Sequence, residues 1–90
     1  MSRVSRTVTI TNRRGLHARA SAKFVTLAAS QDAQVEVEKD GSSVTGTSIM
    51  GLMMLGAAKG DTITISAEGP DAEATVAAMA ALVEDKFGED

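Results

Sequence analysis

The chain has no cysteine, tryptophan or tyrosine, and its 90 residues include one histidine, one proline and two phenylalanines. Without cysteine neither a disulfide framework nor a thiolate metal site can form, and a single histidine leaves few metal ligands, so we expect no metal and no cofactor. Nucleic acid is also disfavoured as a partner, because the net charge is −3 and few aromatic rings are present to stack on bases.

Long hydrophobic runs are absent as well. No stretch reaches the roughly 18 apolar residues that a membrane span requires, and the first residues lack the apolar segment of a secretory signal. We therefore expect a cytoplasmic protein that does not insert directly into a membrane. Ninety residues can bury one modest core, so residues 1–90 are expected to form a single domain, and nothing in them predicts more than a monomer.

The apolar residues that are present follow two clear periods. Alternation of apolar and polar residues, typical of half-buried strands, occurs at 4–11, 34–38 and 62–68, and a short further run follows at Val44 and Thr45. Helical spacing occurs at 18–30, 49–55 and 71–87. Asp40-Gly41 lies between the second and third strand patterns, which predicts a hairpin with a type I′ turn. The order β-α-β-β-α-β-α predicts an α+β fold in which helices cover one face of a four-stranded antiparallel sheet.

Two helix starts carry residues that can cap them. Ser48 precedes the helix at 49–55, which closes at Gly56, and Asp71 is expected to cap the last helix. Glu73 would favour the dipole in the first turn of that helix. One face of the last helix is predicted to be apolar: Val76, Met79, Ala80, Val83 and Phe87.

The only histidine, His17, lies between the first strand pattern and the first helix pattern, and Arg19 follows two residues later. A helix start offers unpaired N–H groups and the positive end of the helix dipole, which together favour an anion. Imidazole is largely neutral and nucleophilic near neutral pH, and arginine supplies a permanent charge suited to phosphate oxygens. His17 and Arg19 are therefore predicted to form a site that accepts a phosphoryl group and passes it on. Arg13 and Arg14 are interpreted instead as loop residues that aid solubility and electrostatic steering.

The helix at 49–55 contains more apolar residues than one face of a short helix can bury. Some of them must be exposed, and exposed Met and Ile beside a phosphate site would form an adaptable docking patch. A phosphate on Ser48 would be tolerated by the helix dipole, so the same hydroxyl can cap the helix and accept a modification.

These segments resemble the HPr family, the histidine-containing phosphocarrier proteins of the bacterial phosphoenolpyruvate-dependent phosphotransferase system. Residues 15–19, Gly-Leu-His-Ala-Arg, are similar to the active-site segment of the family, and residues 47–55 are similar to its regulatory-serine segment. Residues 58–61 and the strand that follows also fit, so the resemblance covers nearly the whole chain. The chain differs in having Ala20 where the family commonly has proline, which would leave the start of the helix less rigidly held.

The resemblance implies an open-faced β-sandwich with strand order 1-4-2-3. It also implies that His17 takes a phosphoryl group on Nδ1 from phosphorylated Enzyme I and gives it to a histidine of an Enzyme IIA domain. Such a protein is a carrier rather than a stand-alone enzyme, and it would serve sugar uptake or the nitrogen-related phosphorelay. Ser48 would be the target of the HPr kinase/phosphorylase where a bacterium has one. Three side chains would point outward as the partner-binding patch, and two others inward: Ile49, Met50 and Met53 outward, Leu52 and Leu55 inward.

Two other functions remain open on the residues alone. The chain could be a non-catalytic regulatory adaptor controlled by phosphorylation of Ser48. The resemblance argues against this, because family members that act only as adaptors tend to lack the histidine that is present here as His17. It could also be a small ligand-binding α/β regulatory module, but no glycine-rich phosphate loop or carboxylate cluster favours that function.

Overall fold

The computed structural model describes residues 3–89, which form four strands, three α-helices and one 3-10 turn. The elements in chain order are β1 (Arg3–Thr9), α1 (Ala18–Ala29), β2 (Gln34–Lys39), β3 (Ser42–Thr45), α2 (Ile49–Met54), β4 (Thr62–Glu68), α3 (Ala72–Glu84) and η1 (Lys86–Gly88). Among these residues no helix combines the length and the apolar character needed to cross a membrane.

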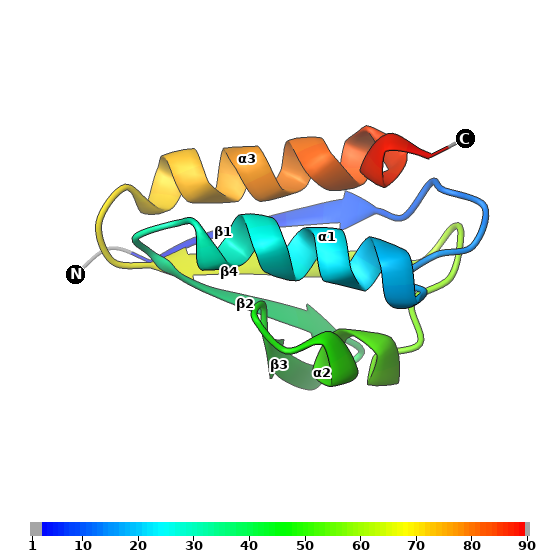
Figure 1. Ribbon diagram of the computed structural model, residues 1–90. Helices are drawn as coiled ribbons and strands as arrows, with labels where there is room; N and C mark the ends of the chain where they lie inside the picture. Colours follow the sequence, from blue (N-terminus) through cyan, green and yellow to red (C-terminus); the bar gives the residue numbers. More distant parts are fainter. Residues whose placement is uncertain (1–2, 90) are drawn as a thin grey trace.

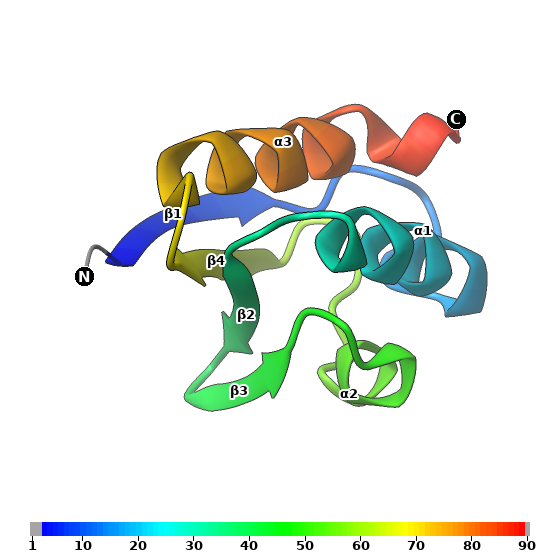
Figure 2. The ribbon, with the colours of Figure 1, turned by 60° about the vertical axis from the view of Figure 1, so that its left-hand side comes forward.

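The sheet is antiparallel with the order β1-β4-β2-β3, which confirms the expected α+β architecture. The helices lie over one face of it, with α3 on the β1 side, α1 in the middle and α2 on the β3 side (Figures 1 and 2). The other face is uncovered and polar, and hydroxyl pairs bridge neighbouring strands there, such as Ser5 with Ser66 at 2.9 Å and Thr7 with Thr64 at 3.1 Å.

The core lies between the sheet and the helices and is largely aliphatic. Val8 faces Ile63 and Val37 faces Ile65 across neighbouring strands, and each of these four side chains is buried. Phe24 from α1 is fully buried in the same core. This alternation of buried and exposed residues follows from the period of two along each strand, as predicted.

The hairpin between β2 and β3 is confirmed. Asp40 and Gly41 have φ values of 51° and 86°, so both central residues are left-handed, as a type I′ turn requires.

Two predictions for the last helix are wrong. Asp71 does precede α3, but it has φ 58° and its side chain makes no capping hydrogen bond. An N-cap side chain needs extended backbone to reach the first free amides, and the left-handed conformation turns it away from them. Phe87 is buried as predicted but is not helical, because α3 ends at Glu84 and Phe87 lies in η1 with φ 56°.

Candidate functional site

The loop before α1 is held against the segment that follows α2. Gly15 has φ +66°, and the next residue, Leu16, donates its amide to the carbonyl of Ala57 at 2.9 Å. A Cβ at Gly15 would lie 2.3 Å from the Ala57 oxygen and 2.9 Å from the Ala58 Cα. Glycine is therefore required here twice over, for the backbone conformation and for the close approach of two chains.

His17 is the N-cap residue of α1. Its backbone is extended, with φ −75° and ψ 179°, and its Nδ1 accepts a hydrogen bond from the amide of Arg19 at 3.2 Å. The Nδ1 lone pair therefore points at the backbone amide of Arg19 in the first turn of the helix. The side chain is 15% exposed, so the ring is partly covered without being sealed in the core.

The other ring nitrogen is paired with a carboxylate from the C-terminal segment. Nε2 lies 2.7 Å from Oε2 of Glu89. Because Nδ1 accepts a hydrogen bond, the neutral ring carries its proton on Nε2 and donates it to Glu89. Partial burial raises the pKa of Glu89, but the hydrogen bonds from Asn12 and His17 and the nearby charges of His17 and Lys23 outweigh this, so the pKa lies below its ordinary value.

Asn12 connects the loop to the same carboxylate. Its side chain is fully buried, and its Nδ2 donates to the carbonyl of Gly15 at 2.8 Å and to Oε1 of Glu89 at 3.1 Å. Both partners are acceptors, which fixes the orientation of the amide. One buried asparagine thus ties the loop before His17 to the carboxylate that contacts His17.

A basic concavity of about 410 Å³ lies beside this site. Among the described residues, none of its four cations forms an ion pair with a carboxylate. Its lining consists of Arg13, Arg14, Arg19, Lys23, Gly88 and Glu89. The structure thus brings Arg13 and Arg14, which the sequence predicts to aid solubility and steering, to the same basic concavity as Arg19. Arg19 touches His17 through its backbone amide; its guanidinium makes no hydrogen bond to the ring.

The second predicted site lies at the start of α2. Ser48 is the N-cap, and its Oγ accepts from the amide of Gly51 at 3.0 Å, so the predicted cap is confirmed. Leu52 is fully buried and Leu55 packs against the core. The outward residues form the apolar patch of α2, with exposures of 40% for Ile49, 69% for Met50, 41% for Met53 and 80% for Met54. Met54, the most exposed of them, was not among the predicted patch residues.

The two helices meet at one end of the molecule. Figures 1 and 2 show the start of α1, the last turn of α2 and the C-terminal segment all at that end. The hydrogen bond from Leu16 to Ala57 joins the loop before α1 to the segment after α2. The start of α1, where His17 is the N-cap, and α2 therefore lie at the same end of the molecule.

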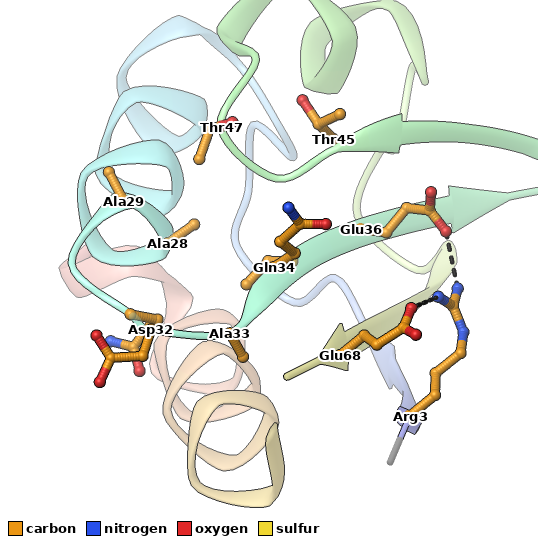
Figure 3. A pocket seen from close by; sticks show the side chains of 12 residues that line it. Arg3, Ala28, Ala29, Asp32, Ala33, Gln34, Glu36, Thr45, Thr47 and Glu68 are labelled. Carbon is orange, nitrogen blue, oxygen red and sulfur yellow. Dashed lines mark hydrogen bonds and ion pairs between the residues drawn. The ribbon is translucent and has the colours of Figure 1, made fainter. Parts of the chain in front are cut away.

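A separate pocket of about 430 Å³ lies at the opposite end of α1, where it is lined by Ala28, Ala29 and residues of the strands (Figure 3). Arg3 forms ion pairs there with Glu36 at 2.8 Å and with Glu68 at 3.6 Å, while Asp32 also lines the pocket. The pocket contains no histidine and is not part of the site around His17. Within residues 3–89 no group of His, Asp and Glu is placed to hold a metal ion.

Comparison with known proteins gives the family. Residues 4–85 match the profile described as "PTS HPr component phosphorylation site". The chain is 45% identical to a phosphocarrier protein HPr of Cupriavidus necator, in an alignment that covers 96% of this chain and 97% of that protein. It is 42% identical to a phosphocarrier protein NPr of Shewanella violacea, in an alignment that covers 99% of this chain and 98% of that protein. Among solved structures it resembles an HPr of Thermoanaerobacter tengcongensis with a TM-score of 0.90 and 46% identity, over 100% and 99% of the two chains. The chain belongs to the HPr family and is a phosphocarrier of a phosphotransferase relay rather than a stand-alone enzyme.

Proposed function

We propose that this phosphocarrier, a single monomeric cytoplasmic domain, accepts its phosphoryl group on Nδ1 of His17 from phosphorylated Enzyme I and donates it to a histidine of an Enzyme IIA domain. The observation that carries the proposal is the hydrogen bond that Nδ1 accepts from the amide of Arg19 at the start of α1, which makes Nδ1 the unprotonated nitrogen of the neutral ring. The relay is that of sugar uptake or the nitrogen-related branch, and relatives named HPr and NPr match the chain about equally well.

The transfer step follows from this arrangement. Nδ1 gives up its hydrogen bond from the amide of Arg19, and its lone pair attacks the phosphorus atom. The Nδ1–P bond forms, and the bond between phosphorus and the donor breaks with its electron pair left on the donor. The proton stays on Nε2, so the ring becomes positively charged, and the carboxylate of Glu89 lies 2.7 Å from that nitrogen to balance the charge. No separate base is required. The reverse sequence hands the group to the next protein.

The phosphorylated form is stabilised only modestly. A phosphate adds about −1.5 to −2 charges, and an exposed helix start contributes about 0.3–1 kcal/mol per charge. Charge-assisted hydrogen bonds from the free amides, and from Arg19 once its guanidinium turns toward the phosphate, add to this. Modest stabilisation suits a carrier, because a strongly stabilised phosphorylated form would not pass its phosphoryl group on.

The basic concavity gives the four cations a role in docking. Phosphoryl transfer depends on in-line positioning and charge neutralisation, so a partner with acidic residues around its own histidine would be guided onto this surface. Arg19 would contact the phosphate, while Arg13, Arg14 and Lys23 would act on the encounter.

The apolar patch of α2 would provide the contact area for the same partners. The family resemblance implies Ile49, Met50 and Met53 as patch residues, and Met54 extends the patch. Flexible thioether side chains can adapt to several different surfaces, as a carrier that meets both a donor and an acceptor requires.

Phosphorylation of Ser48 by an HPr kinase/phosphorylase would regulate this docking. Its hydroxyl is half-buried and lies at the start of α2, where negative charge is favoured, so a phosphate would not unfold the helix. It would place about −2 charges beside the apolar patch and weaken the docking of partners that present acidic residues.

The function is tested by incubating the protein with phosphoenolpyruvate and Enzyme I, followed by mass spectrometry after acid and after alkaline treatment. We expect one phosphoryl group that is lost in acid and survives alkali, is retained in Ser48→Ala and is absent from His17→Ala. Acid-stable phosphate confined to Ser48, with none on His17, would instead support the regulatory adaptor. A phosphoryl group that persists in His17→Ala would show that another residue is the acceptor.

A further inference from the structure

The C-terminal segment after α3 has an unusual backbone. Lys86, Phe87 and Gly88 all have positive φ values, of 58°, 56° and 75°. Two of them carry side chains, which disfavour this conformation, so the surrounding contacts must compensate for the strain.

Those contacts are specific. The ring of Phe87 is fully buried in the core, and its carbonyl accepts a hydrogen bond from Nζ of Lys23 at 2.8 Å. The amide of Gly88 donates to the carbonyl of Asp85 at 3.0 Å, and that of Glu89 donates to the carbonyl of Lys86 at 2.9 Å. The segment is therefore a fixed turn that leads from the core to the surface at His17.

The turn delivers Glu89 to two groups at once. Its Oε1 accepts from the buried amide of Asn12 and its Oε2 accepts from the ring of His17. A carboxylate held by two partners has little freedom to leave either. An acceptor so placed stabilises the neutral ring that carries its proton on Nε2 over the ring that carries it on Nδ1, because only the first can donate to it.

We propose that Glu89 is a positioning residue of the phosphoryl acceptor, which holds the ring proton of His17 on Nε2 and so keeps Nδ1 unprotonated, with a lone pair that can attack phosphorus, while Asn12 fixes Glu89 in place. This rests on the proposed role of His17 as acceptor. The same contact opposes the positive charge that the ring gains in transfer, so Glu89 acts both before and after the step. A purely structural tail would need only the Phe87 anchor and not the carboxylate.

The test separates the two ways in which a carboxylate can act. Glu89→Ala removes both the acceptor and the charge, whereas Glu89→Gln keeps an acceptor oxygen and loses the charge. Glu84→Ala is the matched control, because this exposed carboxylate at the end of α3 makes no hydrogen bond or ion pair with the described residues. For each protein the ¹⁵N chemical shifts of the His17 ring give the fraction of neutral rings with the proton on Nε2.

We expect Glu89→Ala to lower that fraction and to slow phosphoryl acceptance from Enzyme I by about threefold to tenfold, the range for loss of a partly exposed hydrogen bond to a charged group. Glu89→Gln should restore the fraction but not the full rate, and Glu84→Ala should match the wild type in both. An unchanged ring tautomer in Glu89→Ala would overturn the proposal. Because the tautomer is measured on the unphosphorylated protein, that result is distinct from a failure of His17→Ala to abolish phosphorylation, which would overturn the proposed function itself.

Discussion

Replacement of Gly15 by alanine tests how the loop before α1 holds His17, and Gly56 offers a matched control. Both glycines have φ +66°, so alanine pays the same backbone penalty of about 1–2 kcal/mol at either position. The surroundings differ. A Cβ at Gly15 would lie 2.3 Å from the Ala57 oxygen, whereas a Cβ at Gly56 would have nothing within 4 Å.

The extra cost at Gly15 can be worked out from what must move. The Ala57 oxygen belongs to the backbone and cannot rotate away, so the two chains must separate and the 2.9 Å hydrogen bond from Leu16 must lengthen. A lost backbone hydrogen bond costs about 0.5–1.5 kcal/mol. We therefore expect Gly56→Ala to destabilise the protein by about 1–2 kcal/mol and Gly15→Ala by about 1.5–3.5 kcal/mol.

Urea and thermal unfolding measure the difference. In a domain of this size each kcal/mol lowers the melting temperature by about 4–8 °C, so Gly15→Ala should melt clearly below Gly56→Ala. It should also accept a phosphoryl group more slowly than Gly56→Ala, because His17 follows the displaced segment. Equal stabilities for the two variants would refute the argument that close approach, and not backbone conformation alone, requires Gly15.

Further predictions concern the caps, the patch and the tail. Ser48→Ala should lose about 1 kcal/mol of stability, and His17 should still be phosphorylated. Ser48→Asp should keep the stability, but steady-state transfer assays should show a higher KM of the partner proteins for this carrier. Replacement of Met50 and Met54 by serine should weaken transfer to partners and change the unfolding free energy by less than about 0.5 kcal/mol, since both side chains are exposed; a large loss of stability would contradict their placement. Phe87→Ala should cost about 3–5 kcal/mol in urea unfolding, because the ring is fully buried, and near-neutral behaviour would contradict the anchored tail. The fold lowers the pKa of Glu89, so its ionised form contributes stability at neutral pH that is lost as the pH falls through the acidic range. The difference in unfolding free energy between wild type and Glu89→Gln should therefore shrink on acidification. A difference that grows would show that the fold raises the pKa of Glu89 instead.

Much of the fold could be predicted because it depends on local patterns. The alternation along β1 and β4, the left-handed pair Asp40-Gly41 and the hydroxyl cap at Ser48 each have a short-range physical cause that a sequence displays. The strand order has no such cause, and only the resemblance implied it. The position of Asp71 shows the limit of the same reasoning, because a residue type that can cap a helix does so only if its backbone is extended.

The site was predictable in part for the same reason. His17 and Arg19 lie two residues apart, so a single motif reveals them. Glu89 reaches His17 across a separation of 72 residues, through a turn whose positive φ values no pattern predicts. The only hint in the sequence was an acidic tail on a chain whose cations gather near its start, and that hint indicates attraction without naming a contact.

The claim on which the account depends is that phosphorus bonds to Nδ1 of His17 at the start of α1. Nuclear magnetic resonance of the ¹⁵N-labelled protein, phosphorylated by Enzyme I and phosphoenolpyruvate, tests it directly through the ¹⁵N shifts of the ring and their coupling to ³¹P. The account predicts that coupling at Nδ1, with the proton retained on Nε2. Coupling at Nε2, or a phosphorylated protein whose His17 ring carries no phosphorus, would contradict it.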